Sequence, residues 1–459
     1  MSFPEENKKD IEFLKEKLGL NEGNFENFQE NEKFEKQEKK NNIKILSSEV
    51  TFSKNPEVKD FVKNLRNRFD SIRKIIMEHS ELEGLVSINK ISSNRKRFSV
   101  IGMVSDKRIT REKNLLLEIE DLTGKMRVLI NKNKPELFEK AENITLDSVL
   151  GFKGTGKREI LFASDVIFPD SMLFERKKSP FDENVLFLGD LHFGSKLFLK
   201  NNFLKFIDYV NCKIPNTPEA EKVKYIFLVG DIITGVGNYP NQEEDLEIYD
   251  LEEQFLQLSE ILKKIRKDIT IIISPGNHDC VRIMEPQPVL DEKFAWALYD
   301  MENVIITTNP ALVNIGAKGN FEGFNVLTYH GFSFTYYAGN IPKLLQKRAM
   351  NCPEEIMKYL LINRHLAPTH ASVQFFPLED DALIIKKVPD IFVAAHTHKS
   401  GVSSYNNTLI ISTSCWEEMT PYQEKFGNKP DHCKVPMLNL KKGVVKILDF
   451  EEVENENRN

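Results

Sequence analysis

Several features of common protein classes are missing from this chain of 459 residues. No apolar run approaches the ~20 residues that a helix needs to cross a bilayer, and the first residues lack the basic-then-apolar order of a secretory signal. The five cysteines are odd in number and form no Cys-x-x-Cys pair, which argues against a disulfide framework or a zinc ribbon. The formal net charge of −6 argues against a generic polyanion binder, so any nucleic-acid contact has to be a local basic patch or be shared with a partner. We therefore expect a cytoplasmic protein.

The length predicts two or three domains, and the composition changes along the chain. Residues 1–55 are rich in Glu, Lys and Asn, and we expect a flexible charged tail there, with a segment that folds on binding a partner as the alternative. Over residues 56–83, apolar residues at spacings of three and four predict a helical lead-in. These residues are Phe61, Leu65, Phe69, Ile72 and Ile76.

Residues 84–175 have the pattern of short strands separated by turns. We expect an all-β OB-type barrel of five strands, with a short helix near Pro135–Lys140 between the third strand and the fourth. The expected strands are Arg97–Val104, Leu115–Asp121, Met126–Asn131, Ser148–Lys153 and Glu159–Phe168.

A basic segment lies between the first two of these strands. Its cations are Lys107, Arg108, Arg111 and Lys113. OB barrels commonly bind nucleic acid on this side, so DNA binding is one interpretation of the segment. The other interpretation is an ordinary solvated surface loop.

From residue 176 to residue 459 we expect a layered α/β domain, because apolar runs alternate with helical patterns. Five runs suit strands that are buried on both faces: Val185–Leu188, Tyr225–Val229, Ile269–Ile273, Val326–Thr328 and Ile391–Ala394. Each run leads into a segment of metal-binding residue types. These segments contain Asp190, His192, Asp231, Asn277, His278, His330, His396 and His398. Open α/β sheets build their sites just past the carboxyl ends of strands, so we expect these side chains to meet.

Imidazole and carboxylate together suit Mn, Fe and Zn, whereas an all-oxygen set would suit Mg or Ca. Two ions that share a carboxylate can neutralise phosphate oxygens and activate a water, and Asp231, alone at a strand end, is the expected bridge. His278 is placed to act as general acid. Asp279 either orients His278 or closes the turn. Each segment alone could be a plain turn or a packed histidine, but the ordered set of five favours a binuclear metal centre.

These residues resemble the motifs of the calcineurin-like metallophosphoesterase superfamily over about residues 184–418, with Ala395 where the family usually has Gly. The resemblance implies one ion held by Asp190, His192, Asp231 and His398. It implies a second ion held by Asp231, Asn277, His330 and His396, with His278 as the acid.

A narrower resemblance rests on four further segments. They are Gly235-Val236-Gly237-Asn238-Tyr239-Pro240, Glu285-Pro286-Gln287-Pro288, Arg364-His365-Leu366-Ala367-Pro368 and Thr420-Pro421-Tyr422-Gln423. Together with the expected barrel, they resemble the small, exonuclease subunit of the archaeal family-D DNA polymerases. We expect Arg364 and His365 to brace the fold or the subunit interface rather than to take part in catalysis.

The narrower resemblance implies 3′→5′ hydrolysis of DNA for proofreading, acting on single-stranded or frayed 3′ ends. It also implies two divalent ions, with Mn first and Fe or Zn as alternatives. It implies a heteromer with the large polymerising subunit, and it leaves a contact with the sliding clamp open.

Two other functions stay open on the sequence. A purely structural polymerase subunit, as in the related eukaryotic B-subunits, would have lost ligand residues, whereas every ligand position here holds a competent residue. A stand-alone phosphatase or nucleotidase would not explain the barrel or the Pro-Gln-Pro and His-Leu-Ala-Pro segments.

Overall fold

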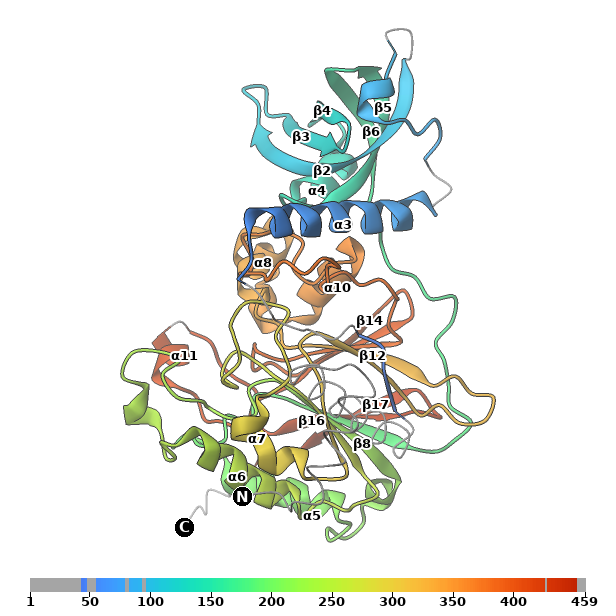
Figure 1. Cartoon of the computed structure of the whole chain (residues 1–459). Helices are drawn as coiled ribbons and strands as arrows, with labels where there is room; N and C mark the ends of the chain where they lie inside the picture. Colours follow the sequence, from blue (N-terminus) through green and yellow to red (C-terminus); the bar gives the residue numbers. More distant parts are fainter. Residues whose placement is uncertain (1–42, 48–54, 79–81, 93–95, 426, 452–459) are drawn as a thin grey trace, which may run out of the picture.

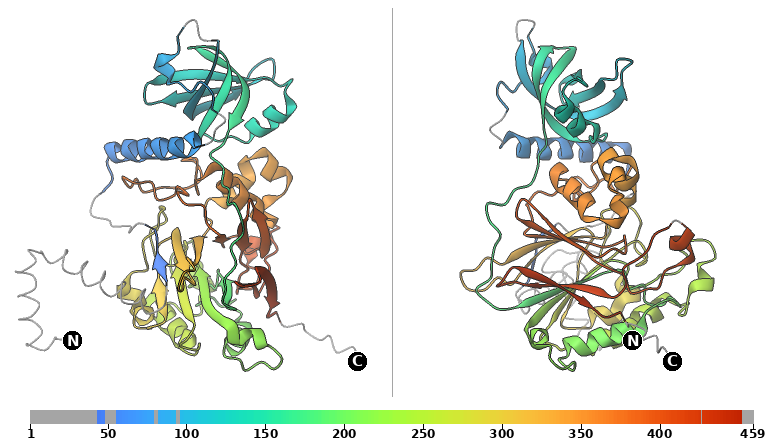
Figure 2. Two further views of the ribbon diagram at one scale, coloured as in Figure 1. Left: turned by 90° about the vertical axis from the view of Figure 1, so that its right-hand side faces the viewer. Right: turned by 180° about the vertical axis from the view of Figure 1, so that it is seen from behind.

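The computed structural model describes residues 43–47, 55–78, 82–92, 96–425 and 427–451. A closed barrel stands at one end of the molecule, the helix α3 (Val58–Met77) runs beneath it, and two sheets with their helices form the larger body (Figure 1). Figure 2 shows the same stacking from the side and from behind. Helix α3 therefore lies between the barrel and the larger body.

The barrel has five strands in the closed order β2-β3-β4-β6-β5. They are β2 (Arg97–Ile109), β3 (Leu115–Asp121), β4 (Gly124–Ile130), β5 (Val149–Lys157) and β6 (Ile160–Ile167), with the 3-10 turn η1 (Ile88–Lys90) before them and α4 (Pro135–Glu142) between β4 and β5. Alternate residues of each strand point inward, and buried side chains such as Val100, Leu117, Val128 and Phe152 fill the interior. The prediction of five strands with a helix between the third and the fourth is confirmed.

The basic segment differs from the expected loop. Strand β2 continues to Ile109, so Lys107 and Arg108 belong to the strand and only residues 110–114 form the turn. Nζ of Lys107 donates to the carbonyl oxygens of Glu142 and Ile144 at 2.5 and 2.7 Å, and burial lowers the pKa of Lys107. Three of the four cations stay exposed: Arg108, Arg111 and Lys113.

Helix α3 packs on the barrel through apolar side chains and contacts the body through a buried polar cluster, among other contacts. Its buried Phe69, Ile72 and Ile76 pack with Ile101, Met103, Val149 and Ile167 of the barrel. On the body side, Nε of Arg68 donates to Oδ2 of Asp381 at 2.7 Å, and Nε2 of His365 lies 3.0 Å from the same oxygen. All three of these side chains are buried, so His365 braces the fold as expected.

The body contains two six-stranded sheets. The first has the order β1 (Lys44–Ile45), β11 (Ala311–Ile315), β12 (Phe324–Tyr329), β13 (Ile391–Ala394), β15 (Thr408–Ser412), β14 (Gly401–Tyr405). The second has the order β10 (Val304–Ile306), β9 (Thr270–Ser274), β8 (Val223–Val229), β7 (Asn184–Leu188), β16 (Lys434–Asn439), β17 (Val444–Asp449). All five predicted apolar runs are strands, and they are fully buried because both of their faces are covered.

Helices cover the outer face of each sheet, so the body has four layers. Helices α5 (Lys200–Val210), α6 (Leu251–Leu262) and α7 (Glu292–Tyr299) pack on the second sheet, and α8 (Phe334–Asn340), α9 (Pro342–Gln346) and α10 (Glu354–Asn363) pack on the first. The other short elements are η2 (Pro218–Lys222), η3 (Gln242–Asp245), η4 (Ala349–Asn351) and α11 (Pro421–Lys425). Among the described residues, no helix combines the length and the apolar character needed to span a membrane.

Part of the expected tail belongs to the first sheet. Lys44 and Ile45 pair antiparallel with Asn314 and Val313 of β11, and the buried Ile43 joins the core between the sheets. The prediction of a flexible tail over residues 1–55 is therefore wrong for residues 43–47. For residues 1–42 and 48–54 this prediction lies outside the described residues.

Removing the side chain of Arg68 should destabilise the packing of helix α3 on the body. The substitution Arg68→Ala leaves the Asp381 carboxylate buried without its guanidinium partner, and we expect the free energy of unfolding to fall by about 3–5 kcal/mol. Urea unfolding followed by circular dichroism measures the change. Arg66→Ala is the matched control, because Arg66 is exposed on the same helix. Equal stabilities of the two variants would contradict the bracing role of Arg68.

Candidate metal centre

The predicted metal ligands and His278 all come after the carboxyl ends of parallel strands. The second sheet contributes Asp190 and His192 after β7, Asp231 after β8, and Asn277 and His278 after β9. The first sheet contributes His330 after β12, and His396 and His398 after β13. The sheets face each other across a shared core, so these two rows of loops meet at the same end of the sandwich.

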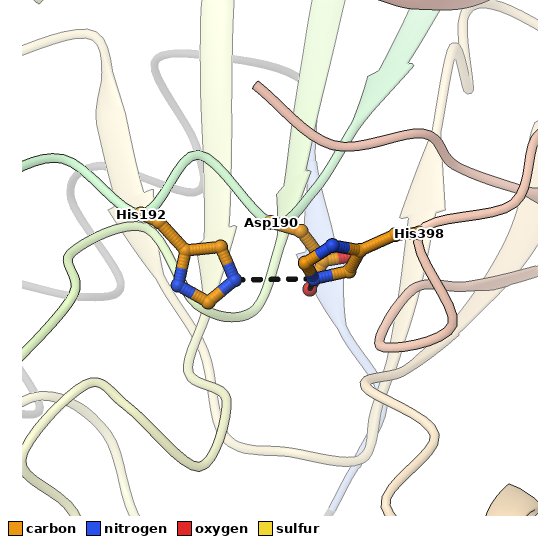
Figure 3. A group of neighbouring side chains, drawn as sticks. All are labelled: Asp190, His192 and His398. Atoms are coloured by element: carbon orange, nitrogen blue, oxygen red, sulfur yellow. Dashed lines mark hydrogen bonds and ion pairs between the residues drawn. The ribbon is translucent and has the colours of Figure 1, made fainter. Parts of the chain in front are cut away.

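One group of donor atoms comes from Asp190, His192 and His398 (Figure 3). Nε2 of His192 lies 3.2 Å from Nε2 of His398, which lies 3.8 Å from Oδ1 of Asp190. That oxygen is buried and has no hydrogen-bond partner among the described residues, whereas Oδ2 accepts from the N–H of His396 at 2.8 Å. Two ring nitrogens and one unpartnered carboxylate oxygen therefore converge.

A second group contains Asp231, His330 and His396, with the amide of Asn277 beside them. Nε2 of His330 lies 3.2 Å from Oδ2 of Asp231, 2.9 Å from Oδ1 of Asn277 and 3.2 Å from Nδ1 of His396. Asp231 also forms a third group with His192 and His278. The carboxylate of Asp231 is thus close both to His330 and His396 and to His192 of the first group. A ligand that bridges two ions would have to lie in this position.

The protonation of the imidazoles depends on burial and on the two carboxylates. Burial, followed by the charge of His278, lowers the pKa of His192 to about 3, and burial and His330 do the same for His396. These rings are neutral at pH 7 and have a lone pair to offer. Burial alone would lower the pKa of His330, but the carboxylates of Asp231, Asp190 and Asp279 together outweigh it and raise this pKa to about 9. An ion bound by His330 therefore has to displace one proton.

The backbone at the site is strained. Five of the ligand candidates have a positive φ, between 48° and 69°: Asp190, His192, Asp231, His396 and His398. Residues with a Cβ rarely adopt this left-handed conformation, and it persists only where the surrounding structure enforces it. Such strain is typical of functional sites, where side chains must turn sharply toward one point.

Two glycines allow the loops to approach each other closely. A Cβ on Gly230 would lie 2.1 Å from Nδ1 of His330, and a Cβ on Gly276 would lie 2.3 Å from Oδ1 of Asp231. Neither contact is possible between real atoms, so any larger residue at these positions has to displace a ligand candidate. Close packing therefore requires glycine before Asp231 and before Asn277.

His278 is held by the loop after β8. Its backbone N–H donates to Oδ1 of Asp231 at 2.7 Å, and its Nδ1–H donates to the carbonyl oxygen of Thr234 at 2.9 Å. This contact fixes the tautomer and leaves Nε2 as the nitrogen that can exchange a proton. The ring of His278 stands edge-on to His192, with centroids 4.9 Å apart.

Asp279 closes the turn and does not orient His278. Oδ2 accepts from the N–H of Gly276 at 2.7 Å, and Oδ1 accepts from the N–H of Ile233 at 3.0 Å. Burial raises the pKa of Asp279 to about 7. The side chain thus ties together the loops that carry Asp231 and Asn277.

Sequence reasoning assigned no role to three further polar side chains that hold the site. Oδ1 of Asn309 accepts from the N–H of His330 at 2.8 Å, and its Nδ2 donates to Oε1 of Gln287 at 2.6 Å. Gln287 in turn donates to the carbonyl oxygen of Gly276 at 3.2 Å. The amide of Gln423 lies 2.9 Å from Nδ1 of His398. Asn309 lies just past the end of β10, so the strand-end pattern could have indicated it.

The basic segment is not part of this centre. Arg108, Arg111 and Lys113 lie on the barrel, which helix α3 and the helices α8–α10 separate from the sheets (Figure 1). Arg364 also lies outside the centre. Its guanidinium donates to the carbonyl oxygens of Ile385, Lys386 and Asp170 at 2.7, 2.7 and 3.1 Å, so it braces the fold as expected.

The calcineurin-like phosphoesterase family matches residues 183–400, the span that carries all seven ligand candidates. With this fold and this set of side chains, the body is a metallophosphoesterase domain, the class of domain that hydrolyses phosphate esters with divalent metal ions.

Similar proteins cover more of the chain. A DNA polymerase II small subunit from Methanothermobacter thermautotrophicus is 34% identical over 86% of this chain and 80% of its own length. Those from Pyrococcus furiosus and Methanocaldococcus jannaschii are 34% and 35% identical, over 89% and 84% of this chain and 67% and 64% of their own lengths. The chain belongs to the family of archaeal DNA polymerase II small subunits, which confirms the narrower resemblance.

The close contact at Gly276 gives a test of the site. In Gly276→Ala the new methyl group displaces the carboxylate of Asp231, so we expect the affinity for Mn²⁺ to fall while the fold is kept. Isothermal titration with Mn²⁺ measures the affinity. Gly339→Ala is the control, because a Cβ there has nothing within 4 Å. An unchanged affinity of Gly276→Ala would show that Asp231 does not bind the ion.

Proposed function

We propose that this chain is the 3′→5′ exonuclease subunit of a heteromeric DNA polymerase, acting on single-stranded or frayed 3′ ends. The observation that carries the proposal is the completeness of the donor set: seven positions hold residues able to bind metal, and their donor atoms converge in the interior. A silent scaffold would have no need to keep two buried carboxylates side by side, since burying a charge is unfavourable unless it is compensated.

The donor set fits two divalent ions. Oδ1 of Asp190 has no partner among the described residues, and burial keeps His192 and His396 in the neutral form that binds metal. One ion would be held by Asp190, His192, Asp231 and His398, and the other by Asp231, Asn277, His330 and His396. Bound there, the ions would neutralise phosphate oxygens and lower the pKa of the attacking water. Mixed imidazole, carboxylate and amide donors favour Mn, with Fe and Zn as alternatives.

The proposed reaction breaks the bond between phosphorus and the 3′ oxygen of the penultimate nucleotide. Water supplies the oxygen that forms the new bond to phosphorus, and the departing 3′ oxygen needs a proton. Doubly protonated His278 would supply it from Nε2–H, while its Nδ1–H stays on the carbonyl of Thr234, and the ring would be left neutral. The products are a 5′-mononucleotide and a strand that ends in a 3′ hydroxyl.

We further propose a division of labour along the chain. Residues 84–175 form an OB-type domain that contacts DNA, with a helical lead-in over residues 56–83. Residues 176–459 form the exonuclease domain, to which the strand at residues 44–45 also belongs. The partner is the large, polymerising subunit. The three exposed cations of the barrel are the groups that support DNA contact.

A direct test uses the heteromer and the isolated chain, each with Mn²⁺. We expect mononucleotides to be released from the 3′ end of a single-stranded oligonucleotide and a small phosphomonoester to remain intact. If the heteromer cleaves neither DNA nor a small phosphodiester with Mn²⁺, Fe²⁺ or Zn²⁺, the chain is a structural subunit. Rapid hydrolysis of the phosphomonoester alone would indicate a phosphatase.

His278→Ala should abolish most of the cleavage while both ions stay bound. The departing oxygen then lacks its proton donor, a loss that typically costs ~10²–10⁴-fold in rate. Single-turnover kinetics on the oligonucleotide and elemental analysis of the dialysed protein measure the two properties. The control is His370→Ala, since His370 is exposed and contacts Asp147 instead of the centre. Loss of metal from His278→Ala would show that this residue is a ligand and would contradict its role as general acid.

The barrel cations should hold DNA without taking part in the cut. Changing Arg108, Arg111 and Lys113 to Ser should weaken single-stranded DNA binding and flatten its salt slope by ~0.7 for each phosphate interaction removed. Lys107 is left intact because its ammonium donates to the carbonyls of Glu142 and Ile144 at the end of α4. Fluorescence anisotropy at several salt concentrations measures both quantities.

The matched control for these cations changes Lys205, Lys264 and Lys267 to Ser, three exposed lysines on the far side of the body. It removes the same charge. If the two triple variants bind DNA equally well, the barrel segment is only a solvated surface.

A further inference from the structure

The segment that links the barrel to the body forms a strap across one end of the sandwich. We define the strap as residues 170–178, which lie between β6 and β7 in the green chain at the right of Figure 1. The N–H of Leu173 donates to the carbonyl of Asn406 in the β14–β15 hairpin at 3.1 Å. Just past the strap, the N–H of Ser179 donates to the carbonyl of Leu440, beside the β16–β17 hairpin, at 2.9 Å. The strap therefore bridges the edges of both sheets.

The backbone of the strap is held firmly. The hydroxyl of Tyr405 donates to Oδ1 of Asp170 at 2.9 Å, and the carbonyl oxygen of Asp170 accepts from Arg364. Nδ2 of Asn406 donates to the carbonyl of Ser171 at 2.9 Å, and Nδ2 of Asn407 donates to that of Leu173 at 2.8 Å. These hydrogen bonds fix the conformation of residues 170–173, although the segment lies at the surface.

This fixed backbone presents two large apolar side chains to solvent. Met172 is 69% exposed and Phe174 is 103% exposed, whereas Leu173 between them is half-buried. The two exposed side chains lie on either side of Leu173 in the sequence, and we treat them as a pair. Val444, in the hairpin that lies beside Lys178, is also exposed, at 59%. Large apolar side chains exposed on a fixed backbone, as Met172 and Phe174 are, are candidates for an interaction site.

Charged side chains follow the pair along the strap. Glu175, Arg176 and Lys178 are exposed, as are Lys441 and Lys442 of the hairpin beside Lys178, so positive charge predominates. A hollow beside the strap is lined by Arg176, Asn407, Leu440 and Gly443. A complementary surface would therefore offer an apolar pocket with carboxylates around it.

The strap and the metal centre lie at opposite ends of the strands. β7 starts at Asn184, a few residues after the strap, and ends just before Asp190. Likewise β14 starts just after His398 and ends at Tyr405, which contacts the strap. Five residues of strand span roughly 15–17 Å. A macromolecule on the strap leaves the centre open, and a DNA strand bound there would not be led into it, which favours a protein.

We propose that the strap anchors the large polymerase subunit, with Met172 and Phe174 inserted into an apolar pocket whose carboxylates pair with Arg176 and Lys178. The inference rests on the proposed function only for the identity of the partner. A stable heteromer needs about 1,200–2,000 Å² of buried surface, so other parts of the body add contact area. Aromatic side chains that fill pockets carry a large share of the binding energy in such interfaces.

The test measures the affinity of the full-length chain for the large subunit by biolayer interferometry. Changing both Met172 and Phe174 to Ser should weaken binding by ~100-fold or more, since two apolar side chains no longer fill the pocket. Tyr249→Ser is the control, another large exposed side chain, beside α6 at 61% exposure, and it should bind as the wild type does. Both variants should hydrolyse a small phosphodiester at the wild-type rate, because neither touches the metal centre.

Each other outcome overturns the proposal in a recognisable way. A double variant that binds the large subunit with wild-type affinity removes the strap from the interface. Loss of DNA affinity with an intact heteromer makes the strap a nucleic-acid surface instead. If even the wild-type chain fails to bind the large subunit, the proposed partnership itself is wrong, which the unmodified protein alone reveals.

Discussion

The rest of the phosphoesterase body depends on the burial of two carboxylates, Asp190 and Asp231, next to each other. Bringing a charge from water into the interior is strongly unfavourable unless donors or opposite charges compensate it. The protein compensates half of each group: Oδ2 of Asp190 accepts from the N–H of His396, and Oδ1 of Asp231 accepts from the N–H of His278. The other oxygen of each carboxylate faces imidazole nitrogens. Divalent cations bound here would complete the compensation, so metal binding would also stabilise the surrounding loops.

Holding these groups in place requires both sheets and a network of polar side chains. The ligand candidates come from loops of two facing sheets, and no single loop could supply them. Asp279 ties the Asp231 loop to the Asn277 loop, and Gln287 with Asn309 ties the Asn277 loop to His330. Each of these contacts joins the loop after one strand to the loop after a neighbouring strand. The loops can therefore tolerate left-handed backbone at five positions.

The strand-end residues of the site could be predicted from the sequence because buried parallel strands appear as apolar runs, and the residues just after such a run lie at the edge of a sheet. The barrel strands were predictable for a similar reason, from alternation and turn residues. The pairing of Lys44 and Ile45 with β11 could not be predicted. Strand β11 lies more than 260 residues away, and a two-residue strand has no periodicity of its own. The hydrogen bonds from Lys107 to the carbonyls at the end of α4 depend on how the barrel closes, which the local sequence pattern does not encode. The same holds for the role of Asp279, whose partners Ile233 and Gly276 lie on two different loops.

The central claim is that Asp231 bridges two ions held by one buried donor set. Elemental analysis of protein dialysed against Mn²⁺ tests it most directly, with the wild type, Asp231→Asn and His398→Asn measured side by side. We predict two ions per chain in the wild type, retention of one in His398→Asn and loss of both in Asp231→Asn. Two ions retained by Asp231→Asn, or none bound by the wild type, would contradict the account.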